Sequence, residues 1–233
     1  MKIWRKALPD QALPMYFGAV KGHQMKGRLV MPAPKKYDIY KEFAADYVNP
    51  KTPAFVQIKR AAYLAIAGRG EPGGKSFTAS IGALYNVAFT VKMARKFAGR
   101  DYTVSKLEGL WWIDDPNRSF MDEPPQNWQW KLMIRTPDFI TENEAAAAIE
   151  KLLAKGKPQE VANVRLEELT EGRCVQVLHL GPYDKERPTI ASMVTFAKEN
   201  GLKFHGLHHE IYLSDPRRVA PAKLRTILRH PVK

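Results

Sequence analysis

Residues 161–180, VANVRLEELTEGRCVQVLHL, repeat a pattern that the chain first shows at residues 54–67, AFVQIKRAAYLAIA. Both stretches are apolar runs with a short polar interruption, which predicts a β-hairpin in each place. The first runs into the glycine-rich loop Gly68–Gly74 and the second into Gly181-Pro182. Because such a sequence of features occurs twice in the same order, these two stretches decide the fold.

The same elements follow each hairpin. A helix comes next and ends at a glycine, Gly99 in the first copy and Gly201 in the second. Two further strands complete each copy, at 104–113 and 128–135 and then at 207–213 and 226–232. The sequence therefore predicts an α+β fold of two tandem hairpin–helix–strand–strand modules. Their antiparallel sheets would lie about a pseudo-two-fold axis, with a ligand groove between them.

The remaining segments set the predicted boundaries. Thr141 and Glu144 have the spacing of a capping box and predict a helix between the modules. Asp38 is suited to begin an amphipathic helix that Pro50 ends. We expect a basic extension of uncertain order at 1–36 and one domain at 37–233, composed of module one at about 53–140, a linker helix at about 141–156 and module two at about 160–233.

Basic residues are concentrated at the two ends of the chain. Lys and Arg number 37 and Asp and Glu 24, for a formal charge of +13. Residues 1–36 hold eight basic groups and one acid, residues 216–233 hold six and none, and the stretch 37–215 nets zero. The ends could contact phosphate, but we favour solvated ends that keep the protein soluble. Nucleic acid is thus a remote alternative partner.

Composition is that of an ordinary globular protein, with 45% apolar and 26% charged residues. Cys174 is the single cysteine, which excludes an internal disulfide and fits a reducing compartment. Pro9, Asp10 and Pro14 interrupt any signal-peptide core, and no window approaches a membrane span. We expect a cytoplasmic protein without membrane association, and the sequence sets no oligomeric state.

Two glutamates occupy matching positions in the repeat. Glu108 and Glu210 each lie nine residues after the glycine that ends a helix. Strand alternation places Glu108 with Leu110 and Trp112, and Glu210 with His208 and Tyr212, opposite the more apolar residues of each strand. A glutamate facing water from an open sheet is the simpler interpretation. The neighbouring aromatic residues favour the other one, in which both glutamates face the cleft between modules.

A carboxylate walled by aromatic rings attracts a flat, lipophilic, cationic or strongly polarised molecule. Burial would raise the pKa of such a glutamate and make it available for proton transfer, and two close glutamates would share a proton. Trp128 and Trp130 alternate with polar residues. They are core or pocket wall, and the pattern leaves both open.

Several weaker patterns point to cofactors. Residues 68–73 match G-x-G-x-x-G, but hairpins rather than βαβ units surround them, and Pro72 removes an amide donor. We prefer a flexible loop at the mouth of the cleft. His208 and His209 point to opposite faces of a strand, so they cannot readily converge with His205 on a metal. We therefore expect no metal and no organic cofactor.

Five runs of sequence carry a family resemblance: GALYNVAFTVKM (82–93), LEGLWW (107–112), LHLGPYD (178–184), HHEIYLSDPRR (208–218) and LRTILR (224–229). They resemble the GyrI-like small-molecule-binding family, in particular its stand-alone branch, which includes cyclopropanoid cyclopropyl hydrolases. The match covers roughly 37–233, and the loop GEPGGKS departs from it. The resemblance implies a central groove with Glu210 as its carboxylate, a position that drug-sensing relatives use for cationic aromatic compounds.

The expected function combines the residue analysis with this resemblance. We expect capture of planar lipophilic or cationic molecules and hydrolytic opening of the cyclopropane in DNA-alkylating toxins. Glu210, with Glu108, would position or deprotonate water, and Tyr183, Tyr212 or Tyr85 would stabilise the oxyanion. The expected ligand-binding residues are Trp111, Trp112, Trp128, Trp130, Tyr85 and His208. The alternative is a non-catalytic small-molecule sensor or drug-sequestering protein.

Overall fold

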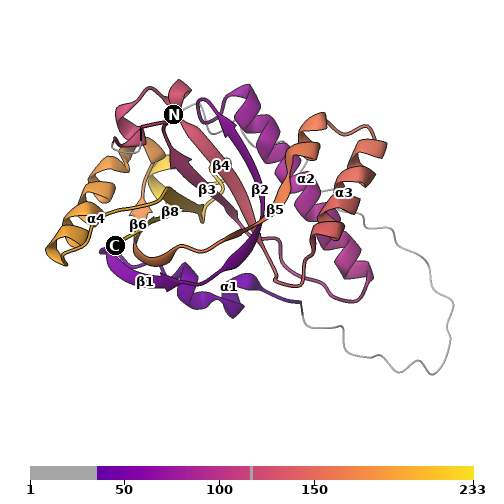
Figure 1. Cartoon of the computed structure of the whole chain (residues 1–233), viewed down its shortest axis with the longest axis horizontal. Coiled ribbons are helices and arrows are strands. Elements are labelled where there is room, and N and C mark those ends of the chain that lie inside the picture. Colours follow the sequence, from indigo (N-terminus) through magenta and orange to yellow (C-terminus); the bar gives the residue numbers. More distant parts are fainter. Residues whose placement is uncertain (1–35, 116–117) are drawn as a thin grey trace.

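The computed structural model describes residues 36–115 and 118–233. Nearly all of the predicted extension 1–36 lies outside the described residues. Eight strands form a single antiparallel sheet in the order β1-β6-β8-β7-β3-β4-β2-β5 (Figure 1). The strands are β1 (Ala54–Ile58), β2 (Ala61–Arg69), β3 (Leu107–Trp112), β4 (Gln129–Thr136), β5 (Arg165–Leu169), β6 (Gly172–Leu180), β7 (His208–Tyr212) and β8 (Arg225–Pro231).

The strand order has the predicted symmetry. β3 and β7 lie side by side at the centre, and outward from them β4 matches β8, β2 matches β6 and β5 matches β1. The helices are α1 (Ile39–Glu42), α2 (Lys75–Phe97), α3 (Glu142–Ala154) and α4 (Arg187–Glu199). The α+β class, the antiparallel pairing and the internal repeat are thus confirmed.

The strands predicted as hairpins do not pair with each other. β1 pairs with β6, and β2 pairs with β4 and β5, so each module gives its first strand to the other. A two-residue hairpin turn needs positive φ angles. Lys59 and Arg60 connect β1 to β2, and positive φ occurs only at glycines in the described part of the chain. This explains why the first predicted hairpin is wrong. The second is wrong as well, since β5 pairs with β2 and β6 pairs with β1 and β8, and the result is one shared sheet rather than one sheet for each module.

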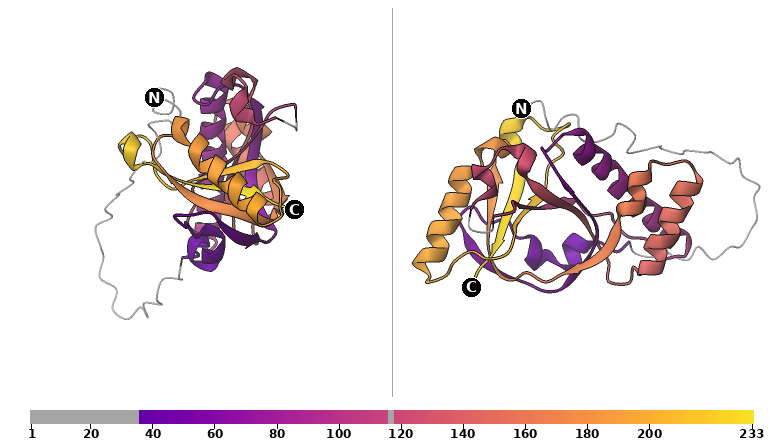
Figure 2. Two further views of the ribbon diagram at one scale, coloured as in Figure 1. Left: turned by 90° about the vertical axis from the view of Figure 1, so that its left-hand side faces the viewer. Right: turned by 45° about the horizontal axis from the view of Figure 1, so that its top comes forward.

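Helices α2 and α4 cover the same face of this sheet. Apolar residues of α2 pack with Trp111 and Leu132, and Met193 of α4 packs with Val177 and Leu228. The strand register places Leu228 opposite Glu210 and Glu210 opposite Gly109, on the face that Trp111 also occupies. The two helices therefore flank the central strands (Figure 2), while α3 packs against α2.

The opposite face is covered by residues 37–47. Ile39 and Tyr47 pack there against Ile211 and Ile227. Asp38 caps α1 as predicted, with its side chain accepting from the Tyr40 amide at 3.0 Å. The predicted single helix up to Pro50 is wrong, because α1 ends at Glu42 and a 3-10 turn, Ala44–Tyr47, follows.

Buried contacts explain this break. The main-chain carbonyl of Asp46 accepts hydrogen bonds from the side chains of Arg229 and Gln176. It is therefore held by the sheet beneath the segment rather than by a continuing helical turn.

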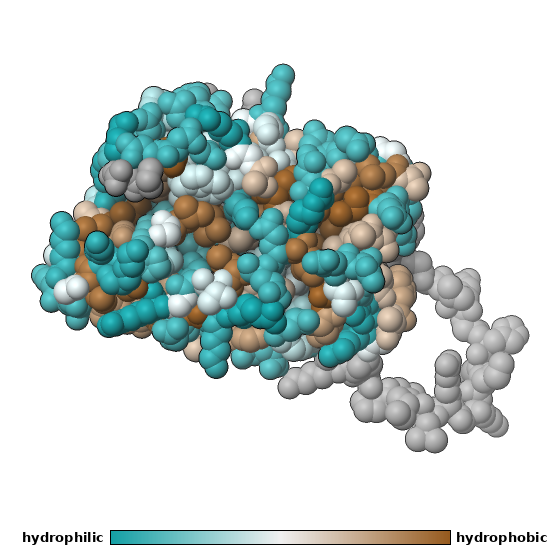
Figure 3. All heavy atoms as spheres, in the orientation of Figure 1, coloured by the Kyte–Doolittle hydropathy of each residue, from teal (hydrophilic) through white to brown (hydrophobic). Residues whose placement is uncertain are grey.

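The predicted helix ends agree with the structure. Thr141 and Glu144 form both hydrogen bonds of a capping box at the start of α3. Gly99 and Gly201 follow α2 and α4 with φ of +80° and +71°. None of the helices within residues 36–115 and 118–233 is long and apolar enough to span a bilayer. Figure 3 shows hydrophilic residues interspersed with smaller apolar areas on one face.

Candidate functional site

A pocket of about 230 Å³ opens on the helix-covered face of the sheet, near the N-terminal ends of α2 and α4. Four loops and the central strands line it, and most of the lining residues are aromatic, Pro, Leu or Met. Among the described residues, the lining includes four acidic side chains and no Lys, Arg or His. The lining consists of Glu71, Pro72, Trp111, Phe120, Met121, Pro125, Trp128, Pro182, Tyr183, Asp184, Glu186, Glu210, Pro216, Pro221 and Leu224.

Two buried carboxyl groups lie together in this pocket. Glu186, at the start of α4, is 2% exposed, and Glu210, on β7, is 5% exposed. Burial, together with the charge of Glu210 and a hydrogen bond to it, raises the pKa of Glu186 well above its usual range. Glu186 therefore holds its proton more tightly than a free glutamate does, and it is the hydrogen-bond donor of the pair.

A chain of hydrogen bonds supports Glu210 from the sheet. The Trp111 indole Nε1 donates to the Tyr212 hydroxyl at 3.1 Å, and Tyr212 is in turn hydrogen-bonded to Glu210. Gly109 lies directly opposite Glu210 on β3. A Cβ at this glycine would lie 3.0 Å from the Tyr212 hydroxyl and 3.1 Å from the Trp111 Nε1. The absence of a side chain at Gly109 therefore makes room for this chain of hydrogen bonds.

Aromatic rings form the pocket walls. Trp128 packs edge-to-face against Phe120, with ring centroids 4.9 Å apart, and against Trp111 at 5.8 Å. The Trp128 indole donates to the Glu123 carbonyl at 2.9 Å, which fixes its orientation. Tyr183 adjoins Glu210, and burial followed by the charge of Glu210 raises the pKa of its hydroxyl. Tyr183 is therefore a neutral hydrogen-bond donor.

His208 lies beside the carboxyl pair, with its Nε2 3.6 Å from Glu210 Oε1. Its ring contacts Phe120, and neither ring nitrogen has a hydrogen-bond partner in the described structure. Glu186, His208 and Glu210 offer donor atoms within 4.8 Å of one another. Zinc ligands lie roughly 3.4 Å apart at normal bond lengths. His208 Nε2 and Glu210 Oε1, 3.6 Å apart, are close to that spacing.

Glu108 does not face the pocket, and the prediction that it shares a cleft with Glu210 is wrong. It pairs with Ile211 across the strands, on the face opposite Glu210. From Gly99 to the start of β3 is eight residues, but from Gly201 to the start of β7 is seven. A difference of one residue reverses the direction of every side chain on a strand. Equal spacing from the glycines was therefore misleading.

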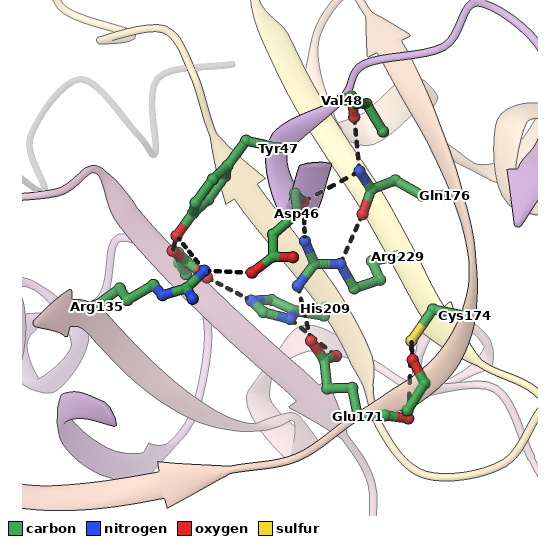
Figure 4. A network of polar contacts seen from close by, with 11 residues as sticks. Asp46, Tyr47, Val48, Arg135, Glu171, Cys174, Gln176, His209 and Arg229 are labelled. Carbon is green, nitrogen blue, oxygen red and sulfur yellow. Dashed lines mark hydrogen bonds and ion pairs between the residues drawn. The ribbon is translucent and has the colours of Figure 1, made fainter. Parts of the chain in front are cut away.

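Glu108 instead belongs to a buried polar network under residues 37–47. Figure 4 shows this network around Tyr47, His209 and Arg229. It accepts from the Tyr47 hydroxyl at 3.0 Å, and its other oxygen lies 3.0 Å from His209 Nε2. Glu171 lies 3.0 Å from the other ring nitrogen of His209 and 2.7 Å from Arg229.

Charge pairing in this network outweighs desolvation. Burial alone would lower the pKa of His209, but Glu171 and Glu108 raise it to about 9. Burial alone would raise the pKa of Glu171, but His209 and Arg229 lower it to about 2. His209 is therefore a cation at neutral pH, bound between two carboxylates. The network connects strands to the covering segment rather than forming a ligand site.

The other predicted ligand-binding residues divide between pocket and core. Trp111 and Trp128 line the pocket, as does Tyr183, while Tyr212 and His208 adjoin Glu210 on the same face of β7. Trp112 packs with Tyr63 and Leu110 on the opposite face. Trp130 is fully buried, with its ring against Gly68, where a Cβ would approach within 2.2 Å. Tyr85 lies on α2 against Phe89, outside the pocket lining.

The sequence analysis missed Glu186, and it also missed Phe120 and Met121. An acid at the start of a helix ordinarily interacts with the helix dipole and faces solvent, so its type and position gave no sign of burial. The one available signal was its place after LGPYD, a run that the family resemblance already included. Glu71 and Pro72 place the glycine-containing loop at the pocket.

The comparisons with known proteins agree with the fold. An uncharacterized conserved protein from Listeria innocua is 35% identical with a TM-score of 0.78, and a hydrolase from Listeria innocua is 33% identical with a TM-score of 0.76. Each match covers 85% of this chain and 100% of the other. The EcmrR C-terminal domain is 14% identical with a TM-score of 0.52, over 78% of this chain and 97% of the domain, and shows a likeness of fold alone.

The search of curated proteins finds no match. The model of the GyrI-like small-molecule-binding domain matches residues 51–233, which include every residue that lines the pocket. The chain therefore belongs to the GyrI-like family of small-molecule-binding domains.

Proposed function

We propose that the protein binds planar lipophilic molecules in this pocket and hydrolyses the strained ring of cyclopropane-bearing alkylating compounds, which would detoxify them. The observation that carries the proposal is a proton-sharing carboxyl pair, Glu186 and Glu210, inside an aromatic pocket. Rings of Trp111, Phe120 and Trp128 offer apolar area to a flat ligand. The hydrolase from Listeria innocua, 33% identical, is further support.

The proposed step adds water across one carbon–carbon bond of the cyclopropane. Glu210 takes a proton from water while the water oxygen attacks the electrophilic ring carbon. The broken bond's electron pair moves to the conjugated carbonyl, where the Tyr183 hydroxyl donates to the developing oxyanion. That oxygen then takes up a proton, so the product is the substrate plus one water. Glu186, which donates to Glu210, has the supporting role first assigned to Glu108.

Substitution of Glu210 tests this mechanism. Glu210→Gln keeps the shape of the side chain but removes the base, so we expect turnover of a cyclopropane-bearing alkylator to fall about 100-fold or more. Mass spectrometry of the water adduct measures it. Glu71→Gln, at a second acid in the lining, is the matched control and should retain turnover. Unchanged turnover in Glu210→Gln would overturn the catalytic assignment.

A second candidate function is capture of lipophilic cations without chemistry. It is favoured by the lining, which has four acidic side chains and no basic one among the described residues. Tight binding that requires Glu210 and yields no product would support this function over hydrolysis. Either activity would operate in the reducing cytoplasm that we propose as its location, where the buried free thiol of Cys174 is stable.

A further inference from the structure

One histidine beside the pocket lacks the partners that a buried ring normally has. His208 is 3% exposed, and neither of its ring nitrogens has a hydrogen-bond partner in the described structure. Its Nε2 lies 3.6 Å from Glu210 Oε1, which is too long for a hydrogen bond. Buried polar atoms are normally satisfied, so this nitrogen points to a further group that both side chains bind.

A third donor comes from another element. Glu186, at the start of α4, offers a carboxylate oxygen, and one donor atom from each of Glu186, His208 and Glu210 lies within 4.8 Å of the other two. His208 and Glu210 share one face of β7, so the strand holds two of the donors in a fixed relation. The sequence argument against a metal considered only His205 and His209 as partners of His208. The structure supplies two carboxylates instead.

One imidazole nitrogen and two carboxylate oxygens form a donor set suited to zinc. Zn²⁺ takes such ligands at roughly 2.0–2.2 Å, and its non-structural sites typically have three protein ligands and one position open to water. Its double charge balances two carboxylates, which the neutral imidazole does not. Among the described residues the pocket lining holds no Lys, Arg or His, so no fixed cation there competes for the carboxylates.

The surroundings orient one of these ligands and lead to the site. Tyr212 is hydrogen-bonded to Glu210 and accepts from the Trp111 indole at 3.1 Å. Hydrogen-bonded partners of this kind fix the direction of a ligating carboxylate. Glu186 and Glu210 both line the pocket of about 230 Å³, which gives the ion a path from solvent and its open position a space for water.

We propose that Glu186, His208 and Glu210 bind one Zn²⁺ ion, with water from the pocket as a further ligand. The ion takes the place of the proton between the two carboxyl groups, and it meets the ring nitrogen of His208 that lacks a partner. This inference goes beyond the proposed hydrolysis, which uses Glu210 as a free base and requires no metal.

Calorimetric titration of the full chain, stripped of metal by a chelator and free of any affinity tag, measures the binding. We expect a dissociation constant for Zn²⁺ of roughly 1 μM or below. Mg²⁺ should bind far more weakly, because it prefers an octahedral shell of oxygen ligands. Equal affinity for the two ions would contradict a site with a histidine ligand.

Co²⁺ in place of Zn²⁺ gives a check that needs no variant. A four-coordinate Co²⁺ ion absorbs visible light strongly, whereas a six-coordinate ion absorbs it weakly. We expect strong bands, from three protein ligands and one water. Weak bands would overturn the proposed coordination.

Substitution of the ligands locates the ion. His208→Leu removes the nitrogen donor at similar size, so affinity for Zn²⁺ should fall about 100-fold or more. His205→Leu, the same substitution at a histidine outside the three ligands, is the matched control and should retain the affinity. Glu186→Gln changes the shape of the site less and should weaken binding about tenfold or more. Circular dichroism and thermal unfolding check that each variant is folded.

The outcomes distinguish this inference from the proposed function. Unchanged affinity for Zn²⁺ in His208→Leu or in Glu186→Gln would overturn the inference, because the ion would then lie elsewhere on the chain. Failure of the wild type to bind Zn²⁺ would overturn it as well. Turnover of a cyclopropane-bearing compound is measured with a chelator present, so the proposed hydrolysis stands or fails independently of the metal.

Discussion

Gly109 is the residue on which the geometry of the pocket floor most directly depends. The Cβ of Gly109→Ala would meet the Tyr212 hydroxyl at 3.0 Å and the Trp111 indole nitrogen at 3.1 Å. We expect the hydrogen bond between these groups to lengthen and Glu210 to lose its support. Affinity for a planar cation should fall about tenfold, and overpacking should cost about 1–3 kcal/mol of stability. Calorimetric titration and denaturant unfolding measure the two effects.

A matched control for this change lies elsewhere on the sheet. Ala65→Gly, in the centre of β2 on the face opposite the pocket, alters a buried strand without touching Trp111 or Tyr212. It should lower stability and leave affinity intact. If Gly109→Ala binds ligand as well as the wild type, the hydrogen-bond chain has no part in holding Glu210.

The direction of a side chain was predicted correctly where alternation along its own strand is enough to determine it. Alternation along β7 gives the shared face of His208, Glu210 and Tyr212 without reference to any other element. The prediction for Glu108 was wrong because its direction relative to Glu210 depends on the register between β3 and β7. A one-residue difference in length between the segments that precede these two strands decides that register. Glu186 was missed because its burial comes from four loops that meet only in the folded chain.

At the scale of elements, α3 offers a direct test of local stabilisation. Thr141 and Glu144 form a capping box, with the Glu144 amide donating to Thr141 Oγ1 and the Thr141 amide donating to Glu144. Thr141→Ala leaves an amide at the helix start without its partner, so stability should fall by about 1 kcal/mol. Urea unfolding measures this, and Thr141→Ser, which keeps the hydroxyl, is the control. A loss equal to that of Thr141→Ala in the serine variant would contradict the capping role.

Element types were more predictable than their pairing. Caps and glycines are local signals, so the ends of α2, α3 and α4 followed from the sequence. Pairing is not local. The strands β1 and β2 are adjacent in sequence, which suggested a hairpin, but their partners lie 60 or more residues away, in β4, β5 and β6. The absence of turn residues at Lys59-Arg60 was the available warning.

At the scale of the whole molecule, the buried His209 and the partly buried His230 should shape the dependence of stability on pH. Contacts with Glu171 and Glu108 raise the pKa of His209 to about 9, against the effect of burial. The stabilisation that protonated His209 gives to the folded state is complete below pH 6.5 and is lost as the pH rises through 9. Burial, followed by His208, lowers the pKa of His230 to about 3, so its stabilisation is lost as the pH falls below 6.5.

Together, these two effects predict that the free energy of unfolding is greatest near pH 6.5. From linkage, the free energy of unfolding should fall by about 3 kcal/mol towards pH 9 and by about 2 kcal/mol towards pH 5. Denaturant titrations across this range measure it. His230→Phe should flatten the acid side, because a phenyl ring can keep the stacking on Phe204, and His209→Gln should flatten the alkaline side. A wild-type profile that is level from pH 5 to 9 would contradict both assignments.

The exchange of β1 and β5 between the modules has a consequence for the origin of the chain. A half-length ancestor with the same four strands would leave one side of its second strand open, as β2 would be without β5 and β6 without β1. Two copies could each lend a first strand to the other, and the pseudo-two-fold axis would then be a true axis of a homodimer. Gene fusion of such a swapped dimer would give the present topology directly and would let the two copies diverge at the centre of the sheet, where Glu210 now lies opposite Gly109.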